Sequence, residues 1–317
     1  MDTLDGLMQK YNFPPQLIFN FDETALDFSA PKLKVVSCAG SAHPFVEMAE
    51  KGEHISFGLC ISASGKSLRP LVILPLKLLP TLSPEVLSFY AFSGSDAGFM
   101  TKEIWWETLT QTIIPDINNV RRTSGQLDAW SLMIVDGHNS RDLAEAVEVC
   151  WAHRIVLACM PAHSSAICQP LDLSVNGIYK NNIRNFFKPK EGESTPDKCN
   201  RLLFLSIYAL QVAFNAYNIQ LGFSRAGIYP FSPQAPLNSR YIKSPFVPTP
   251  PSAPPKGTKR RSISGRVLTP ENTLRGLPPA PAPKKRAPSL KSAPQRRPAV
   301  LPPPSSQVVP IQFIVSK

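Results

Sequence analysis

The sequence predicts a mixed α/β domain followed by a disordered tail rich in Pro, Lys and Arg. Within residues 1–242, short strand-like apolar segments come first, and helical and strand-like segments then alternate. That order is typical of a mixed sheet covered by helices. The composition changes at residue 243, beyond which lie 18 of the 34 prolines and 14 of the 34 Lys and Arg residues.

The tail, residues 243–317, contains one acid, Glu271, so its net charge is +13, whereas residues 1–242 carry 20 basic and 22 acidic residues. Such a segment cannot bury enough apolar surface to offset chain entropy, and we expect it to be disordered. The six cysteines form no Cys-x-x-Cys pair, which indicates a reducing compartment and argues against zinc. The most apolar run, residues 68–79, is interrupted by charges and prolines, so we expect no membrane span and a soluble protein.

The core is predicted to begin with antiparallel strands. A short helix over residues 1–11 is stopped by Pro14 and Pro15, and a strand over 16–21 then places Asp22 at its carboxyl end. Further strands are predicted at 34–38, 54–62 and 68–74, with a turn at 64–66. Residues 101–114 are predicted to form a helix and 116–126 a polar connector.

The second half of the core is predicted to alternate helices and strands. Strands at 131–135 and 154–160 flank a helix over residues 143–151, capped by Asn139 or Ser140. The next helix begins at Asp172, and a last one over 203–217 ends before Gly222. The helix after Asp172 is expected to bury Val175, Tyr179, Ile183 and Phe186 and to carry on its other side Asn176, Lys180 and Arg184.

Three aspartates, Asp22, Asp136 and Asp172, each follow a short apolar run. A carboxylate next to an apolar strand end is costly unless a cation compensates its charge, and Mg²⁺ or Mn²⁺ is the usual partner of such acids. One aspartate in such a place is commonly a turn former or a helix cap. Their joint occurrence favours a shared metal site.

The residues around these acids are specific. Asn-Phe-Asp-Glu-Thr at 20–24, Asp-Gly-His-Asn-Ser at 136–140 and Pro-Ala-His-Ser-Ser-Ala-Ile-Cys-Gln-Pro-Leu-Asp at 161–172 occur in that order. Over roughly residues 1–235, the chain resembles the catalytic core of pogo/Tigger-type DDE transposases, the group that also gave rise to centromere protein B. The resemblance implies a ribonuclease-H-like fold and makes all three aspartates metal ligands and catalytic residues.

The activity that the resemblance implies is DNA cleavage or strand transfer with two divalent ions, which stabilise the attacking and leaving oxygens. Asp22 is expected to bridge both ions, with Asp136 on one and Asp172 on the other. Glu23 is expected to point to the opposite face of the strand and to have a structural or supporting role.

Three further polar residues lie near the acids. His138 is expected either to orient a phosphate or a water or to cap a loop. Lys180 and Arg184 are expected to contact DNA phosphates, with a solvated helix face as the alternative.

The sequence departs from the family at Arg141 and Ala166, where the family usually has histidines, and Ala166 cannot donate or accept a side-chain hydrogen bond. The family also carries helix-turn-helix domains ahead of this core, and we expect sequence-specific DNA reading to be missing from this chain. DNA is the expected partner, and a homodimer is one option. The nucleus is the expected location, because the tail contains basic clusters of the kind that serve as import signals: Lys259, Arg260, Arg261, Lys284, Lys285 and Arg286.

The alternative to an endonuclease is a catalytically inactive, domesticated nuclear protein that binds DNA or other partners. In that case the core is a scaffold and the basic tail binds DNA with strong salt dependence.

Overall fold

The computed structural model describes residues 4–27, 54–136, 144–161, 163–188, 190–238 and 267–268. They belong to one compact unit, Met1–Leu277, and a second unit, Pro278–Lys317, lies outside the described residues. The predicted strand at 34–38, the cap at 139 or 140 and nearly all of the tail also lie outside them.

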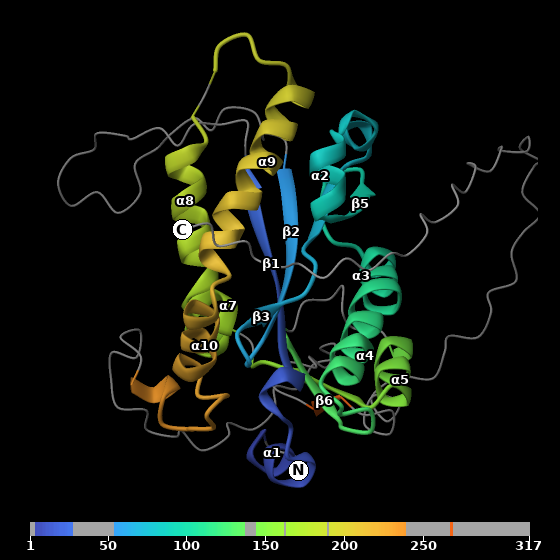
Figure 1. Cartoon of the computed structure of the whole chain (residues 1–317), viewed down its shortest axis with the longest axis vertical. Coiled ribbons are helices and arrows are strands. Elements are labelled where there is room, and N and C mark those ends of the chain that lie inside the picture. Colours follow the sequence, from blue (N-terminus) through green and yellow to red (C-terminus); the bar gives the residue numbers. More distant parts are fainter. Residues whose placement is uncertain are drawn as a thin grey trace, which may run out of the picture. The chain divides into compact units, whose positions relative to one another are not determined.

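One mixed sheet of eight strands forms the centre of the described residues (Figure 1), in the order β5-β4-β2-β1-β6-β7-β8, with β3 paired to β2. The strands are β1 (Ile18–Asp27), β2 (His54–Ser62), β3 (Lys66–Ser67), β4 (Leu71–Pro75), β5 (Ala91–Ser95), β6 (Ser131–Val135), β7 (Ile155–Cys159) and β8 (Val267–Leu268). The antiparallel start, β1 with β2 and β2 with β4, is confirmed. β1, β6 and β7 run parallel, and β8, from the predicted tail, pairs antiparallel with β7.

Helices cover both faces of this sheet (Figure 1). The α-helices are α1 (Leu4–Tyr11), α2 (Pro84–Phe89), α3 (Lys102–Thr108), α4 (Ile114–Thr123), α5 (Ala144–Ala152), α6 (Ser165–Cys168), α7 (Pro170–Leu173), α8 (Val175–Phe186), α9 (Thr195–Ala213) and α10 (Ala216–Arg225). Shorter helical turns are η1 (Pro15–Leu17), η2 (Leu76–Thr81) and η5 (Pro236–Asn238), and a π-helical segment, η3 (Leu109–Ile113), joins α3 to α4. The mixed α/β class predicted from the sequence is confirmed.

The two faces of the sheet bury separate apolar clusters, because side chains alternate along each strand. On β1, Ile18 and Leu26 pack with the α7 to α10 side. Phe19 and Phe21 pack with the α3 to α5 side, where the rings of Phe21 and Trp105 lie 5.1 Å apart. The central strand is therefore covered on both faces.

Two predictions in the first half of the core are wrong. β1 extends to Asp27, so Asp22 lies within a strand and not at its end, because β2 pairs with β1 along the whole stretch from Phe19 to Asp27. The predicted polar connector at 116–126 is largely α4, whose early proline is tolerated in a first turn. Its Arg121 is buried, and the guanidinium donates hydrogen bonds of 2.7–2.9 Å to five acceptors, the carbonyls of Ala129, His153 and Arg154 and the side chains of Asn118 and Ser131.

The last predicted helix is two helices. α9 ends at Ala213 and Asn215 caps α10 by accepting a hydrogen bond from the backbone N–H of Asn218. Gly222 lies inside α10, where an added Cβ would be 2.5 Å from the carbonyl oxygen of Pro170, so α10 packs closely against α7. In the described part of the chain no single helix is long and apolar enough to cross a membrane. Among the described helices, only α9 and α10 taken together, with a bend of 68° between them, reach the length and apolar composition of a membrane span.

Candidate active site

Asp22 lies on the central strand at the point where its parallel neighbour ends. β6 pairs with β1 up to Asn20, opposite Ile134, whereas β2 pairs with β1 well beyond that point. Asp22 is 8 % exposed, and its side chain shares a face with Asn20 and Thr24. A carboxylate is thus placed at the carboxyl edge of the parallel strands, where open α/β sheets bind ligands.

Asp136 directly follows β6 and is half-buried. Asn20 pairs with Ile134, so two residues further along each chain the parallel register brings Asp136 level with Asp22. Ile134 belongs to the apolar cluster on the α8 side, and the alternation of side chains assigns Asp136 to that same face. The register therefore favours the convergence of these two acids that the sequence predicts.

Asp172 belongs to α7, which a buried amide fixes to the sheet. The Asn20 side chain donates to the carbonyl of Ile134 at 3.1 Å and to Oε1 of Gln169 at 2.9 Å, and it accepts from the backbone N–H of Leu171 at 3.1 Å. Both Asn20 and Gln169 are fully buried. Asn20 thereby ties β1, β6 and the segment before Asp172 together.

Asn176, on the first turn of α8, connects two of the acids. Its Nδ2 donates to Oδ2 of Asp22 at 3.1 Å and to Oδ1 of Asp172 at 2.8 Å. Because both oxygens lie within hydrogen-bond distance of one nitrogen, they are at most about 6 Å apart. The sequence prediction that Asn176 lies on the outer side of this helix is wrong, since only 4 % of it is exposed. The prediction that Phe186 is buried is also wrong, because 46 % of it is exposed.

The residues around Asp22 and Asp172 fit a divalent cation. Carboxylate and amide oxygens are the ligands that Mg²⁺ and Mn²⁺ prefer. Three buried oxygens close to these acids in the sequence have no hydrogen-bond partner among the described residues, although buried polar atoms are normally paired: Thr24 Oγ1, Ser174 Oγ and Asn176 Oδ1. The described residues nevertheless include no group of three His, Cys, Asp or Glu side chains already placed to hold one ion. The structure thus connects Asp22 and Asp172 and does not bring Asp136 into a closed three-acid cluster.

The remaining predicted site residues are less closely connected. Glu23 is half-buried on the face of β1 opposite Asp22, as the alternation predicts. Lys180 is half-buried, and Arg184 is exposed and donates to Oδ1 of Asn181 at 2.9 Å. Ala166 is exposed on α6, and His138 and Arg141 lie outside the described residues. The roles of these residues stay predictions.

Asn20, Gln169 and Asn176 are the site residues that sequence reasoning missed as functional. A signal was present in the sequence for Asn20, which stands at a position that faces the core of an apolar strand and so requires buried hydrogen-bond partners. For Asn176 the helical spacing from Asp172, one turn earlier, was the available signal.

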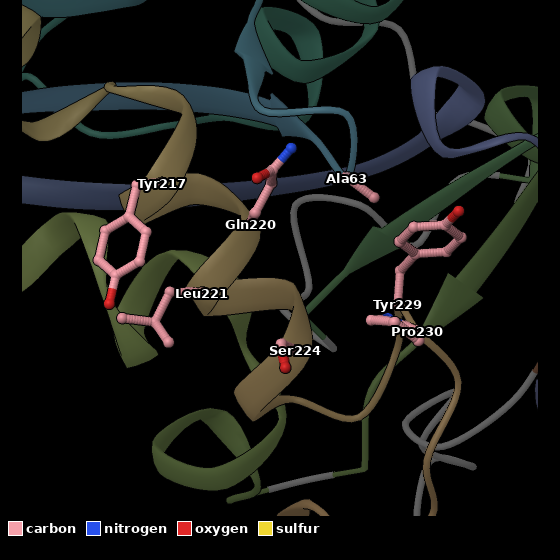
Figure 2. Close-up of a pocket in the computed structure, with 7 residues that line it drawn as sticks. All are labelled: Ala63, Tyr217, Gln220, Leu221, Ser224, Tyr229 and Pro230. Carbon is pink, nitrogen blue, oxygen red and sulfur yellow. The ribbon is translucent and has the colours of Figure 1, made fainter.

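A cavity of about 370 Å³, which none of these acids lines, lies between α10 and the segment that follows it (Figure 2). Its walls are apolar and aromatic for the most part, and no acidic or basic side chain lines it: Ala63, Tyr217, Gln220, Leu221, Ser224, Tyr229 and Pro230. This composition does not suit phosphate or metal binding, so the cavity is separate from the candidate active site.

The fold and the site define a class of protein, a mixed α/β core with acids at the carboxyl edge of its parallel strands. The family model for the DDE superfamily endonucleases matches residues 53–220, more than half of the chain, and the chain belongs to this family. The family membership and the strand order confirm the ribonuclease-H-like fold and the predicted DDE transposase-type domain. Asp136 and Asp172 lie within the match, whereas Asp22 precedes it. The pogo/Tigger subgroup stays a prediction.

The individual proteins that this chain resembles share a low sequence identity with it. The chain is 26% identical over 243 residues to the MFS-type transporter clz9 of Cochliobolus lunatus, and the match covers 74% of this chain and 25% of that protein. The chain therefore spans about a quarter of the length of this relative. Among solved structures, it is similar to the Mos1 mariner paired end complex with Mn (TM-score 0.43, 12% identity, 75% of this chain and 60% of that chain). It is also similar to the Mos1 strand transfer complex (TM-score 0.42, 10% identity, 72% and 57%).

Proposed function

We propose that this chain is a metal-dependent DNA endonuclease or strand-transfer core, with Asp22, Asp136 and Asp172 as its catalytic acids. The observation that carries the proposal is the amide of Asn176, which donates to both Asp22 and Asp172 and so holds two carboxylates from distant parts of the chain together. Family membership supports the reaction class.

Each catalytic acid has a separate role in such a reaction. Divalent ions, Mg²⁺ or Mn²⁺ and two in number by analogy with the family, act as Lewis acids on the attacking and leaving oxygens when bound. In this proposal, Asp22 on β1 and Asp172 on α7 supply the carboxylate oxygens that Asn176 bridges, and Asp136, directly after β6, supplies the third carboxylate. The strand that carries Asp22 and the strand that leads to Asp136 are buried among apolar side chains, and such packing fixes the positions of the acids.

The test is a nicking assay on supercoiled plasmid in Mn²⁺, with the wild-type chain and the variants Asp22→Asn, Asp136→Asn and Asp172→Asn. Each variant is expected to lose at least about 100-fold in rate, because each removes a charged ligand. Asp128→Asn is the matched control, since this exposed aspartate pairs with Arg154 on the surface and should leave the rate unchanged. Full activity in any of the three site variants would refute its assigned role.

DNA contact and nuclear location are further parts of the proposal. Lys180 and Arg184 on α8 follow Asp172 and are proposed to contact phosphates, and the two basic clusters of the tail, at 259–261 and 284–286, are proposed as import signals and nonspecific DNA contacts. Replacing the six clustered Lys and Arg residues by Ala should reduce DNA affinity and its salt dependence and move a fluorescent fusion out of the nucleus. Unchanged affinity and location would contradict these roles.

The nicking assay also addresses the alternative of an inactive nuclear binding protein. A wild-type chain that binds DNA but does not nick it in Mn²⁺ or Mg²⁺ would support that alternative. Sedimentation of the DNA complex would establish whether two copies assemble, as the homodimer expectation requires.

A further inference from the structure

The side chain of Asn176 occupies the space between two carboxylates. Both hydrogens of its amide nitrogen are used, one toward Asp22 and one toward Asp172, at 3.1 and 2.8 Å. A donor that bridges two acids in this way stands where a cation would bind them. Asn176 therefore holds the two acids close together.

The other end of the same amide is unsatisfied. Oδ1 of Asn176 is buried and has no hydrogen-bond partner among the described residues, although a carbonyl oxygen can accept two bonds. Native proteins rarely leave such an oxygen buried and unpaired, and where they do the atom has a reason such as an ion-dependent role. Both N–H donors of the Asn176 amide therefore make hydrogen bonds, whereas its oxygen accepts none from the described residues.

We propose that Asn176 is a fourth oxygen ligand of the metal site, in addition to the three aspartates. A half turn about the Cβ–Cγ bond exchanges Oδ1 with Nδ2 and directs the oxygen into the space between Asp22 and Asp172. Amide carbonyls are hard donors that accept Mg²⁺ and Mn²⁺, so this oxygen suits the same ions as the carboxylates. The inference rests on the proposed metal-dependent function and assigns to it a residue outside the three acids.

Two substitutions distinguish a role of Asn176 as a metal ligand from a role in which it only holds Asp22 and Asp172 together. Asn176→Asp and Asn176→Leu both remove the N–H donor and both keep a side chain of similar length, but only the aspartate offers an oxygen to the ion. Titration calorimetry of the full chain with Mn²⁺ alone should therefore give an affinity at least ~10-fold weaker for Asn176→Leu, the size of effect seen when groups that support a metal site are removed. Asn176→Asp should bind Mn²⁺ more tightly than the wild type, because a fourth carboxylate adds negative charge at the ion.

The control is Asn182→Asp on the same helix. Asn182 also has an unpaired amide atom, and it lies six positions further along α8, about 9 Å away, so the variant adds the same charge to the same helix outside the site. Its Mn²⁺ affinity should stay near that of the wild type. Circular dichroism of every variant checks that the fold is retained.

Each outcome separates the two proposals. Saturable Mn²⁺ binding in the wild type, with Asn176→Leu and Asn176→Asp weakened to the same extent or both unchanged, would overturn the ligand role and leave the proposed function intact. An affinity gain in Asn182→Asp equal to that in Asn176→Asp would reduce the effect to long-range charge and would also overturn it. No saturable binding by the wild type would overturn both the ligand role and the metal site.

Discussion

The hydrogen bonds of Asn20 make a sharp prediction for stability. Replacing Asn20 by Leu keeps the volume but removes the partner of three buried groups, the carbonyl of Ile134, the side-chain oxygen of Gln169 and the N–H of Leu171. An unsatisfied buried group costs about 1–3 kcal/mol, so the free energy of unfolding should fall by about 3–5 kcal/mol, with some relief if Gln169 reorients. That is a large fraction of the 5–15 kcal/mol that is typical of a domain.

Urea unfolding followed by tryptophan fluorescence measures this loss. Asn181→Leu is the control, because Asn181 is exposed on α8 and should change stability by less than about 0.5 kcal/mol. The variant should also weaken Mn²⁺ binding, since the segment that carries Asp172 loses its attachment to β1. A loss below about 1 kcal/mol in Asn20→Leu would show that water satisfies these groups and that Asn20 does not fix the site.

Three other predictions concern the core. Arg121→Met strips a donor from five acceptors and should lower the free energy of unfolding by about 3 kcal/mol or more in the same urea assay; a change under 1 kcal/mol would contradict it. Gly222→Ala forces a Cβ against the carbonyl oxygen of Pro170 in α7 and should lower the free energy of unfolding by about 1–3 kcal/mol. Gly177→Ala lies in α8, where no described atom is within 4 Å of the added Cβ, and should raise the free energy of unfolding by up to about 1 kcal/mol. Equal effects of the two substitutions would refute the packing argument. Burial raises the pKa of the Cys150 thiol from 9.0 to about 12, so the stability that this buried thiol contributes is complete below pH 9 and is lost as the pH rises toward 12. Between pH 8 and pH 10, Cys150 alone should lower the free energy of unfolding by about 1.4 kcal/mol. In Cys150→Ala, the free energy of unfolding should depend less steeply on pH over this range.

The fold class and most of the strands could be predicted from the sequence, because the spacing of apolar residues and the local composition are visible in short segments of the chain. β2 and β6 were predicted at their observed bounds, 54–62 and 131–135, since each is a short apolar run with turn residues beside it. β1 was predicted too short, because its second half, Asp-Glu-Thr-Ala-Leu-Asp at 22–27, is mostly polar without a strand-like alternation and depends on β2 as a partner. α2 and β5 were missed because both are short, with six and five residues.

The candidate site was predicted in part. The acids were recognisable because each stands among characteristic neighbours. The amides that position them were not, because a buried Asn and a solvated Asn have the same side chain and differ only in what the folded chain places around them. Asn176 shows this most clearly, since helical periodicity assigned it to the polar side, whereas the approach of β1 buries it.

The hydrogen bond between Asn176 and Asp22 joins residues 154 positions apart in the chain. Contacts at such separation form late, since a long loop must close before they contribute any stability. A ribosome-bound chain that ends before α8 cannot bring these two residues together, however well its first strands are formed. Asp22 and Asp172 are therefore held together only after synthesis has passed α8, so under the proposed function an unfinished chain lacks the site.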